Sequence, residues 1–208
     1  MRRSRWLGLE SRRSFADTAR AIEARTAAEI VITVKDRSAS YRHVDVSIGA
    51  ALAVLTLLAY VYFPITFSDE LAVPSVLFSF AAGVLLSSAF DAPKRLLVSR
   101  RERHRHVAQA ARAAFVDQGI SATRARTGIL VYVSLLENDL EIVADIGVDP
   151  DGMGAPWRDA RKALDEGARD HVSPEELARL LLALADPLAK ALPVTDDDVN
   201  ELPDEVLE

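Results

Sequence analysis

The residues best suited to chemistry form an acidic stretch at positions 145–152, which contains Asp145, Asp149 and Asp151. Glu137 and Asp139 lie shortly before it and supply two more carboxylates. Hard cations such as Ca²⁺ and Mg²⁺ are held by converging carboxylate oxygens, and loops at strand ends often carry ligand-binding residues. We therefore predict a Ca²⁺ or Mg²⁺ site from these five residues, although the spacing is short of a full EF-hand. The alternative is a solvated turn, because Asp, Pro and Gly are standard turn formers.

Other catalytic arrangements find little support in the sequence. Ser134 has no recognisable base partner, and there is no Gly-rich phosphate loop, Gly-x-Ser-x-Gly elbow or His-Glu-x-x-His helix. The absence of cysteine excludes disulfides, thiolate metal sites and cysteine nucleophiles. His104 and His106 would lie on different faces of a helix, so a shared metal is not expected. No catalytic residue is assigned.

Two arginines, Arg124 and Arg126, precede a predicted strand and could bind a phosphate through bidentate hydrogen bonds. We expect them instead to pair with the acidic C-terminal part of the chain. Glu29 opens the first predicted strand and could face Arg126 across the sheet. We interpret such a pair as structural and not as a general acid.

Three strands must position these groups. Positions 29–35, 128–136 and 140–146 are rich in β-branched residues, and the last two are joined by a short turn at 137–139, which predicts a β-hairpin. Helical spacing predicts helices from Ser14 onward and at 96–118, 157–169 and 174–191, the last with Ser173 as N-cap. Three strands need helices on both faces to bury their apolar side chains. The predicted fold class is α/β, a three-layer α/β/α sandwich with a small mixed sheet.

A pair of long apolar runs interrupts this pattern. Residues 46–68 and 71–90 contain no Asp, Glu, Lys, Arg or His and are separated only by Asp69 and Glu70. A helix needs about 20 mostly apolar residues to span a bilayer, and buried core helices, the alternative, are usually shorter. We predict a transmembrane helical hairpin at 46–90 inside one domain, whose two parts are residues 1–45 and 91–208.

The charged residues predict an orientation. Residues 1–45 carry ten Lys or Arg, the turn of the hairpin carries none, and Lys94 and Arg95 lead a second basic cluster after it. Positive-inside bias places both termini and the soluble domain in the cytoplasm, with two spans in the inner membrane of a bacterium. Residues 137–208 hold 20 Asp or Glu against 6 Lys or Arg. The basic part lies beside the membrane, so anionic lipid is its expected partner and nucleic acid is not.

Several segments resemble the TPM domain family, in the branch whose domain is interrupted by a two-helix membrane insertion. They are residues 21–32, 114–115, 123–134 and 143–147, Trp157, and residues 200–204. The resemblance covers about 14–45 and 96–206 and implies a compact α/β/α sandwich. Members have been associated with acid phosphatase activity, photosystem repair, divalent-cation binding and accessory roles at membrane receptors. Many present the domain outside the cytoplasm, which differs from the orientation that the charges predict.

Two functions follow as expectations. The first is a membrane-anchored binding or accessory module that acts through its acidic, cation-binding face on another membrane protein. The alternative is a metal-assisted phosphatase of phosphomonoesters, in which Asp145, Asp149 and Glu137 hold the ion that polarises phosphate and activates water. The second requires these carboxylates to converge.

Overall fold

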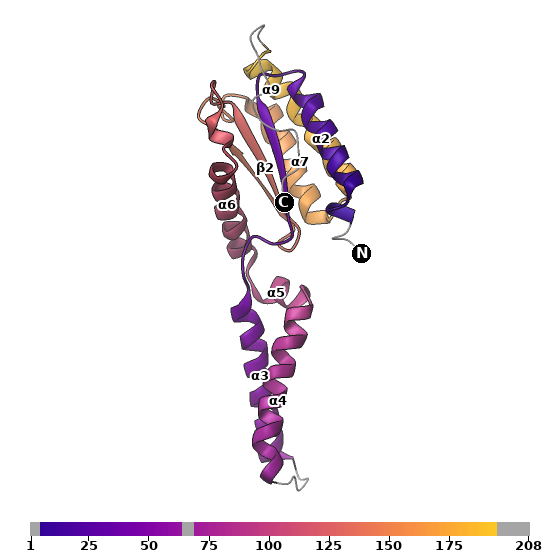
Figure 1. Ribbon diagram of the computed structural model, residues 1–208, viewed down its shortest axis with the longest axis vertical. Helices are drawn as coiled ribbons and strands as arrows, with labels where there is room; N and C mark the ends of the chain where they lie inside the picture. The colour runs from indigo at the N-terminus through magenta and orange to yellow at the C-terminus, as the bar shows by residue number, and fades with distance from the viewer. Residues whose placement is uncertain (1–4, 64–68, 195–208) are drawn as a thin grey trace. The chain divides into compact units, whose positions relative to one another are not determined.

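The computed structural model describes residues 5–63 and 69–194 and divides the chain into two compact units (Figure 1). The first unit contains residues 1–38 and 103–208, and the second contains residues 39–102. The second unit is therefore an insertion in the first. The predicted motif at 200–204 and the turn residues 64–68 lie outside the described residues.

The first unit is built on a sheet of three strands in the order β1 (Glu29–Lys35), β2 (Gly128–Ser134) and β3 (Asp139–Ala144). Strand β2 pairs in parallel with β1 and antiparallel with β3, so the sheet is mixed as predicted. The second strand ends at Ser134, two residues before the predicted end, and residues 135–138 form a turn in which Leu135 and Leu136 donate their N–H groups to the carbonyls of Lys35 and Asp36.

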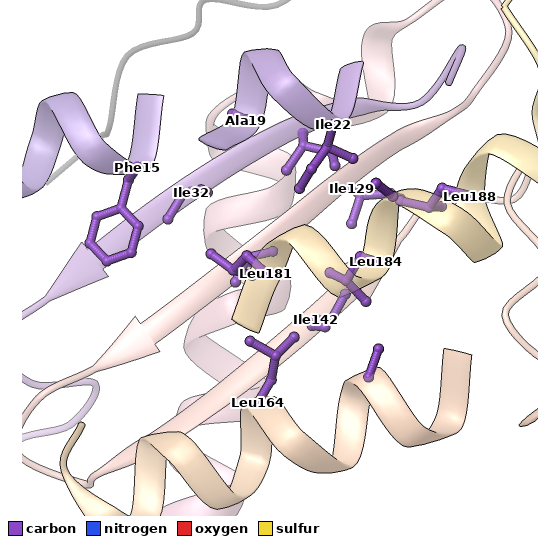
Figure 2. Packing of buried hydrophobic residues seen from close by; sticks show 14 of the residues in the cluster. Phe15, Ala19, Ile22, Ile32, Ile129, Ile142, Leu164, Leu181, Leu184 and Leu188 are labelled. Atoms are coloured by element: carbon purple, nitrogen blue, oxygen red, sulfur yellow. The ribbon is translucent and has the colours of Figure 1, made fainter. Parts of the chain in front are cut away.

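Alternate residues of the strands face two helical layers. One face packs on α2 (Leu9–Glu23), α7 (Gly154–Asp170), α8 (Pro174–Leu181) and α9 (Ala185–Ala191). Figure 2 shows Ile32, Ile129 and Ile142 of the strands among Phe15, Ile22, Leu164 and Leu181 of these helices. The opposite face packs Val31 and Leu130 against Val107 and Ala111 of α6 (Arg100–Asp117). The predicted three-layer sandwich is confirmed.

Some predicted helix boundaries are wrong. Helix α2 begins at Leu9, so Ser14 lies inside it and its carbonyl accepts the Thr18 hydroxyl. The helix predicted at 96–118 is broken into α5 (Ala92–Leu97) and α6, because the backbone of Val98 is extended and its side chain is buried. The helix predicted at 174–191 is divided by a 3-10 turn, η2 (Leu182–Leu184), and a second such turn, η1 (Ile120–Ala122), precedes β2. Ser173 is the N-cap of α8, as predicted.

The inserted unit contains two helices, α3 (Arg42–Tyr62) and α4 (Asp69–Ala89), that run side by side (Figure 1). Both are long and apolar enough to cross a membrane, and their apolar segments are only 17% and 11% buried. Bulky side chains such as Leu57 and Phe78 point outward, while the hydroxyl of Thr56 bonds that of Ser79 at 2.8 Å and that of Ser75 bonds Tyr60 at 3.2 Å. Polar pairs inside and apolar side chains outside are typical of helices that pack in lipid.

Gly49 and Gly83 bring the two helix backbones into contact. A Cβ at Gly83 would lie 2.8 Å from the Gly49 Cα. We expect Gly83→Ile to force the helices apart and destabilise their packing by about 1–3 kcal/mol. A disulfide between cysteines at Thr56 and Ser79 reports the packing, because the chain has no other cysteine.

The disulfide should form readily in the protein that carries only Thr56→Cys and Ser79→Cys. It should form slowly when Gly83→Ile is added to these two changes. Ala81→Ile is the matched control, since Ala81 is exposed on the same helix. Equal rates of disulfide formation in the two variants would show that the glycine contact is not needed.

Candidate functional site at the carboxyl ends of β1 and β2

The carboxyl ends of the parallel strands β1 and β2 lie side by side, with Lys35 opposite Ser134. Crevices at the carboxyl ends of parallel strands are the common ligand sites of open α/β sheets. The turn between β2 and β3 follows at once, and Asn138 in it adopts a left-handed conformation with φ 50°. Asn tolerates that conformation better than most residues, which helps to fix this tight turn.

A buried polar network occupies this end of the sheet. The Ser134 hydroxyl donates to Glu137 Oε2, and the Ser38 hydroxyl bonds Ser134 Oγ at 2.8 Å. The backbone N–H of Ser38 donates to Glu137 Oε1 at 3.1 Å. Ser134 and Glu137 are 1% and 3% exposed. Glu137 therefore ties the segment after β1 to the turn after β2.

The phenol of Tyr132 borders the network. Its oxygen lies 3.5 Å from Ser38 Oγ. Burial raises the pKa of the Tyr132 phenol; the hydrogen bond with Ser38 opposes this rise and the charge of Glu137 adds to it. A phenol with a raised pKa stays protonated at neutral pH, so Tyr132 is a neutral hydrogen-bonding group here.

Both ends of the insertion meet this same turn. Ser38 is the last residue of the first unit before the chain enters the hairpin unit, and Glu137 holds it. The chain returns at residue 103, and His104 Nδ1 lies 2.7 Å from Asp139 Oδ2. The turn thus binds the chain where it leaves the sandwich and where it re-enters.

Charged side chains continue from Asp139 toward α7. Arg161 Nη2 donates to Glu141 Oε2 at 2.9 Å, and Arg161 Nε lies 3.6 Å from Asp165 Oδ1. Burial raises the pKa of Asp165, the charge of Asp139 adds to this rise, and Arg161 and His104 oppose it. The ion pair between Arg161 and Glu141 thus joins α7 to β3.

The buried hydrogen bonds of Ser134 and Glu137 indicate a structural role and not a nucleophilic one. A serine nucleophile must reach its substrate and be activated by a base. The Ser134 hydroxyl is buried and donates to Glu137, whose carboxylate also accepts the Ser38 N–H. The Glu137 carboxylate therefore holds two segments of the chain together and is not placed as a catalytic base.

Asp145 lies at the other end of β3. Strand β3, which begins at Asp139, places its six residues between Glu137 and Asp145, which corresponds to about 20 Å along the strand. Arg126 Nη2 donates to Asp145 Oδ1 at 3.0 Å, and Arg126 Nε lies 2.9 Å from Oδ2. This confirms the prediction that Arg126 pairs with the acidic part of the chain, through Asp145 and not through Glu29.

Asp149 and Asp151 are exposed in the loop before α7. A Cβ at Gly152 would lie 2.6 Å from Asp149 Oδ2, so the Asp149 carboxylate folds closely over this glycine. Within the part of the chain that the structure describes, neither carboxylate has a hydrogen bond or an ion pair. They are the two predicted ligands that remain available to an incoming group.

The five predicted metal ligands therefore lie in three places. Among residues 5–63 and 69–194, no three His, Asp or Glu side chains are grouped so that they could hold a metal ion. The carboxylates of Asp145, Asp149 and Glu137, which the phosphatase alternative requires together, do not share one coordination sphere there. A cation at the exposed pair stays a prediction.

Sequence reasoning missed a second buried polar cluster, within the hairpin unit. Lys94 Nζ lies 3.1 Å from Asp45 Oδ1 and donates to the carbonyls of Ser87 at 2.7 Å and Phe90 at 3.0 Å. Asp45 Oδ1 also accepts the Ser87 hydroxyl at 2.6 Å. Lys94 and Asp45 are 4% and 9% exposed. The signal was present: Asp45 directly precedes the first apolar run and Lys94 follows the second, so a hairpin brings them together.

Comparisons with known proteins support the fold. No family model matches the chain, and no curated protein matches it. Among solved structures, it is similar to the NMR structure of the BA42 protein from the psychrophilic bacterium Bizionia argentinensis, with a TM-score of 0.56 and 17% identity. The similarity covers 97% of this chain and 94% of BA42. At this identity the likeness shows the fold alone.

Proposed function

We propose that the chain is a membrane-anchored protein of the TPM family and that its domain is a binding or accessory module. The observation that carries the proposal is the hairpin. Its two apolar helices expose bulky side chains such as Leu57 and Phe78, whereas the hydroxyls of Thr56 and Ser79 pair in the seam between them. In water these exposed side chains would cost free energy, and in a bilayer they need no cover.

A binding role is supported by the state of the polar groups in the sandwich. Ser134 and Glu137 bond each other below the surface, and Asp145 is paired with Arg126. Asp149 and Asp151 remain exposed in an acidic part of the chain. We propose that this acidic face binds Ca²⁺ or Mg²⁺, or a basic surface of another membrane protein.

The membrane location and orientation can be tested with single cysteines, because the chain has none of its own. Leu9 in the sandwich unit is 75% exposed, and Phe63 at the turn end of α3 is 60% exposed. With both termini cytoplasmic, a membrane-impermeant maleimide should label Phe63→Cys in intact cells and label Leu9→Cys only after permeabilisation. The protein should also resist extraction by alkaline carbonate.

Two results would count against this proposal. Release of the protein by alkaline carbonate would show that it is not anchored in the membrane. Labelling of Leu9→Cys in intact cells would be consistent with a membrane anchor but would show the opposite orientation.

Cation binding should raise the melting temperature of the detergent-solubilised protein, because a ligand of the folded state stabilises it. At about a hundredfold excess over the dissociation constant, we expect Ca²⁺ or Mg²⁺ to raise the melting temperature by roughly 5–10 °C. Asp149→Asn together with Asp151→Asn should abolish the shift. Asp159→Asn is the matched control, since Asp159 is an exposed carboxylate on α7.

The control variant should keep the full shift. A shift that persists without Asp149 and Asp151 would place the cation elsewhere. No shift with either cation would leave the basic protein surface as the partner of this face.

A further inference from the structure

Helix α5 forms an elbow between the second apolar helix and α6. Its outward side chains are apolar: Leu96 is 83% exposed and Leu97 63%, and Phe90 just before the helix is 56% exposed. On the inner side, Lys94 and Val98 are buried. The elbow therefore presents bulky apolar groups to its surroundings within an otherwise charged stretch.

The elbow is fixed to the end of the hairpin by hydrogen bonds. Lys94 Nζ donates to the carbonyls of Ser87 and Phe90, at 2.7 and 3.0 Å, and pairs with Asp45 at the start of α3. Its position relative to α3 and α4 is thus set inside the hairpin unit. If α3 and α4 span a bilayer, the elbow lies where their apolar surface ends.

Arginines flank the apolar side chains of the elbow. Arg95 is partly exposed on α5, and Arg100 and Arg101 are exposed at the start of α6. Apolar groups that enter the acyl boundary, together with cationic groups at the level of the phosphates, are typical of segments that lie in a membrane interface. Phosphatidylglycerol and similar anionic lipids would satisfy both parts of this surface.

We propose that α5 and the first turn of α6 are an interfacial elbow that binds anionic phospholipid head groups. The inference rests on the proposed membrane location and adds the lipid class and the residues that recognise it. Leu96 and Leu97 enter the acyl boundary, and Arg100 and Arg101 pair with lipid phosphates. An acidic protein surface would satisfy the arginines but leave the leucines in water.

The test uses an environment-sensitive fluorophore on a single cysteine in the intact protein, reconstituted in an equimolar mixture of phosphatidylcholine and phosphatidylglycerol. The label is placed at Leu96 or, as the insertion control, at Leu57 in the second half of α3, which is 53% exposed. A quencher is attached to the acyl chains of one lipid class at a time. We expect phosphatidylglycerol to quench the Leu96 label more strongly than phosphatidylcholine, and both to quench the Leu57 label equally.

The double variant Arg100→Gln, Arg101→Gln should abolish the stronger quenching of the Leu96 label by phosphatidylglycerol. Each arginine near the surface is expected to contribute roughly fivefold to the binding of anionic lipid. Equal quenching of the Leu96 label by both lipids, with the Leu57 label quenched, would show that the elbow does not select anionic lipid, while the hairpin is still inserted in the membrane. An unquenched Leu57 label would show that the hairpin itself is not inserted. A preference that survives the double variant would overturn the role of these arginines.

Discussion

Replacing Lys94 by methionine is expected to destabilise the hairpin unit by about 3–5 kcal/mol, because it leaves the buried carboxylate of Asp45 without its cation. The side chains of Lys94 and Asp45 are 5% and 13% exposed, so water cannot replace the lost partner. The carbonyls of Ser87 and Phe90 lose a donor in the same change. Hydrogen exchange of the amides in α5 and the last turn of α4, measured in nanodiscs, should accelerate.

The double variant Asp45→Asn, Lys94→Met separates the two contributions, because an asparagine removes the charge and keeps the Oδ1 acceptor of the Ser87 hydroxyl. It removes both charges, and what remains is the loss of the donor to the carbonyls, about 1–3 kcal/mol. Exchange in the double variant should therefore be slower than in Lys94→Met alone. A double variant as unstable as the single one would show that the ion pair contributes little and that the helix-end carbonyls dominate.

Glu137→Ala is expected to destabilise the sandwich unit by about 3 kcal/mol. The change leaves the buried Ser134 hydroxyl and the partly buried Ser38 N–H without their acceptor, and an unsatisfied buried group costs about 1–3 kcal/mol. Glu137→Gln keeps one acceptor and the shape of the side chain, so its cost should be smaller. Chemical denaturation followed by Trp157 fluorescence reports the unit, because Trp157 is packed in its core.

The measurement is cleanest in a Trp6→Phe background, since the chain has two tryptophans. Glu166→Ala is the matched control: this glutamate lies on α7 with its side chain 56% exposed, and its loss should change the free energy of unfolding by less than about 0.5 kcal/mol. If Glu137→Ala behaves like Glu166→Ala, the buried network does not hold the sandwich together.

The same substitution should loosen the point where the chain leaves the sandwich. Glu137 accepts the N–H of Ser38, the last residue of the first unit before the insertion. Hydrogen exchange at residues 36–40 should therefore increase in Glu137→Ala and stay unchanged in Glu166→Ala. This readout distinguishes a local hold on the crossing segment from a general loss of stability.

The sheet and the hairpin could be predicted because each depends on a short-range pattern. Residues 30–34 are all β-branched and all buried, so the strand is determined by side chains that suit a covered sheet. The two apolar helices follow from length and the absence of charge. The break between α5 and α6 was missed, because helical spacing continues through 96–118 and only the burial of Val98 shows the interruption.

Charges were harder to interpret from the sequence. Lys94 counts among the basic residues that flank the hairpin, yet its ammonium group is buried and paired with Asp45. Arg126 and Asp145 pair because Asp145 N donates to the Gly128 carbonyl and Gly147 N donates to that of Arg126, which brings the ends of two segments together. A residue type gives the charge of a side chain, and its surroundings decide whether that charge is free.

The relative positions of the five acidic residues in the predicted cation site could not be predicted from the sequence. The α/β sandwich, the inserted apolar hairpin and an acidic C-terminal part could be predicted from the order of the residues, because these features follow from periodicity and composition. The burial of Glu137, the pairing of Asp145 with Arg126 and the exposure of Asp149 and Asp151 depend on how the chain folds and are seen in the structure alone. Glu137 and Asp145 are close in the sequence but lie at opposite ends of the sheet, because the six residues of the extended strand β3 between them span about 20 Å.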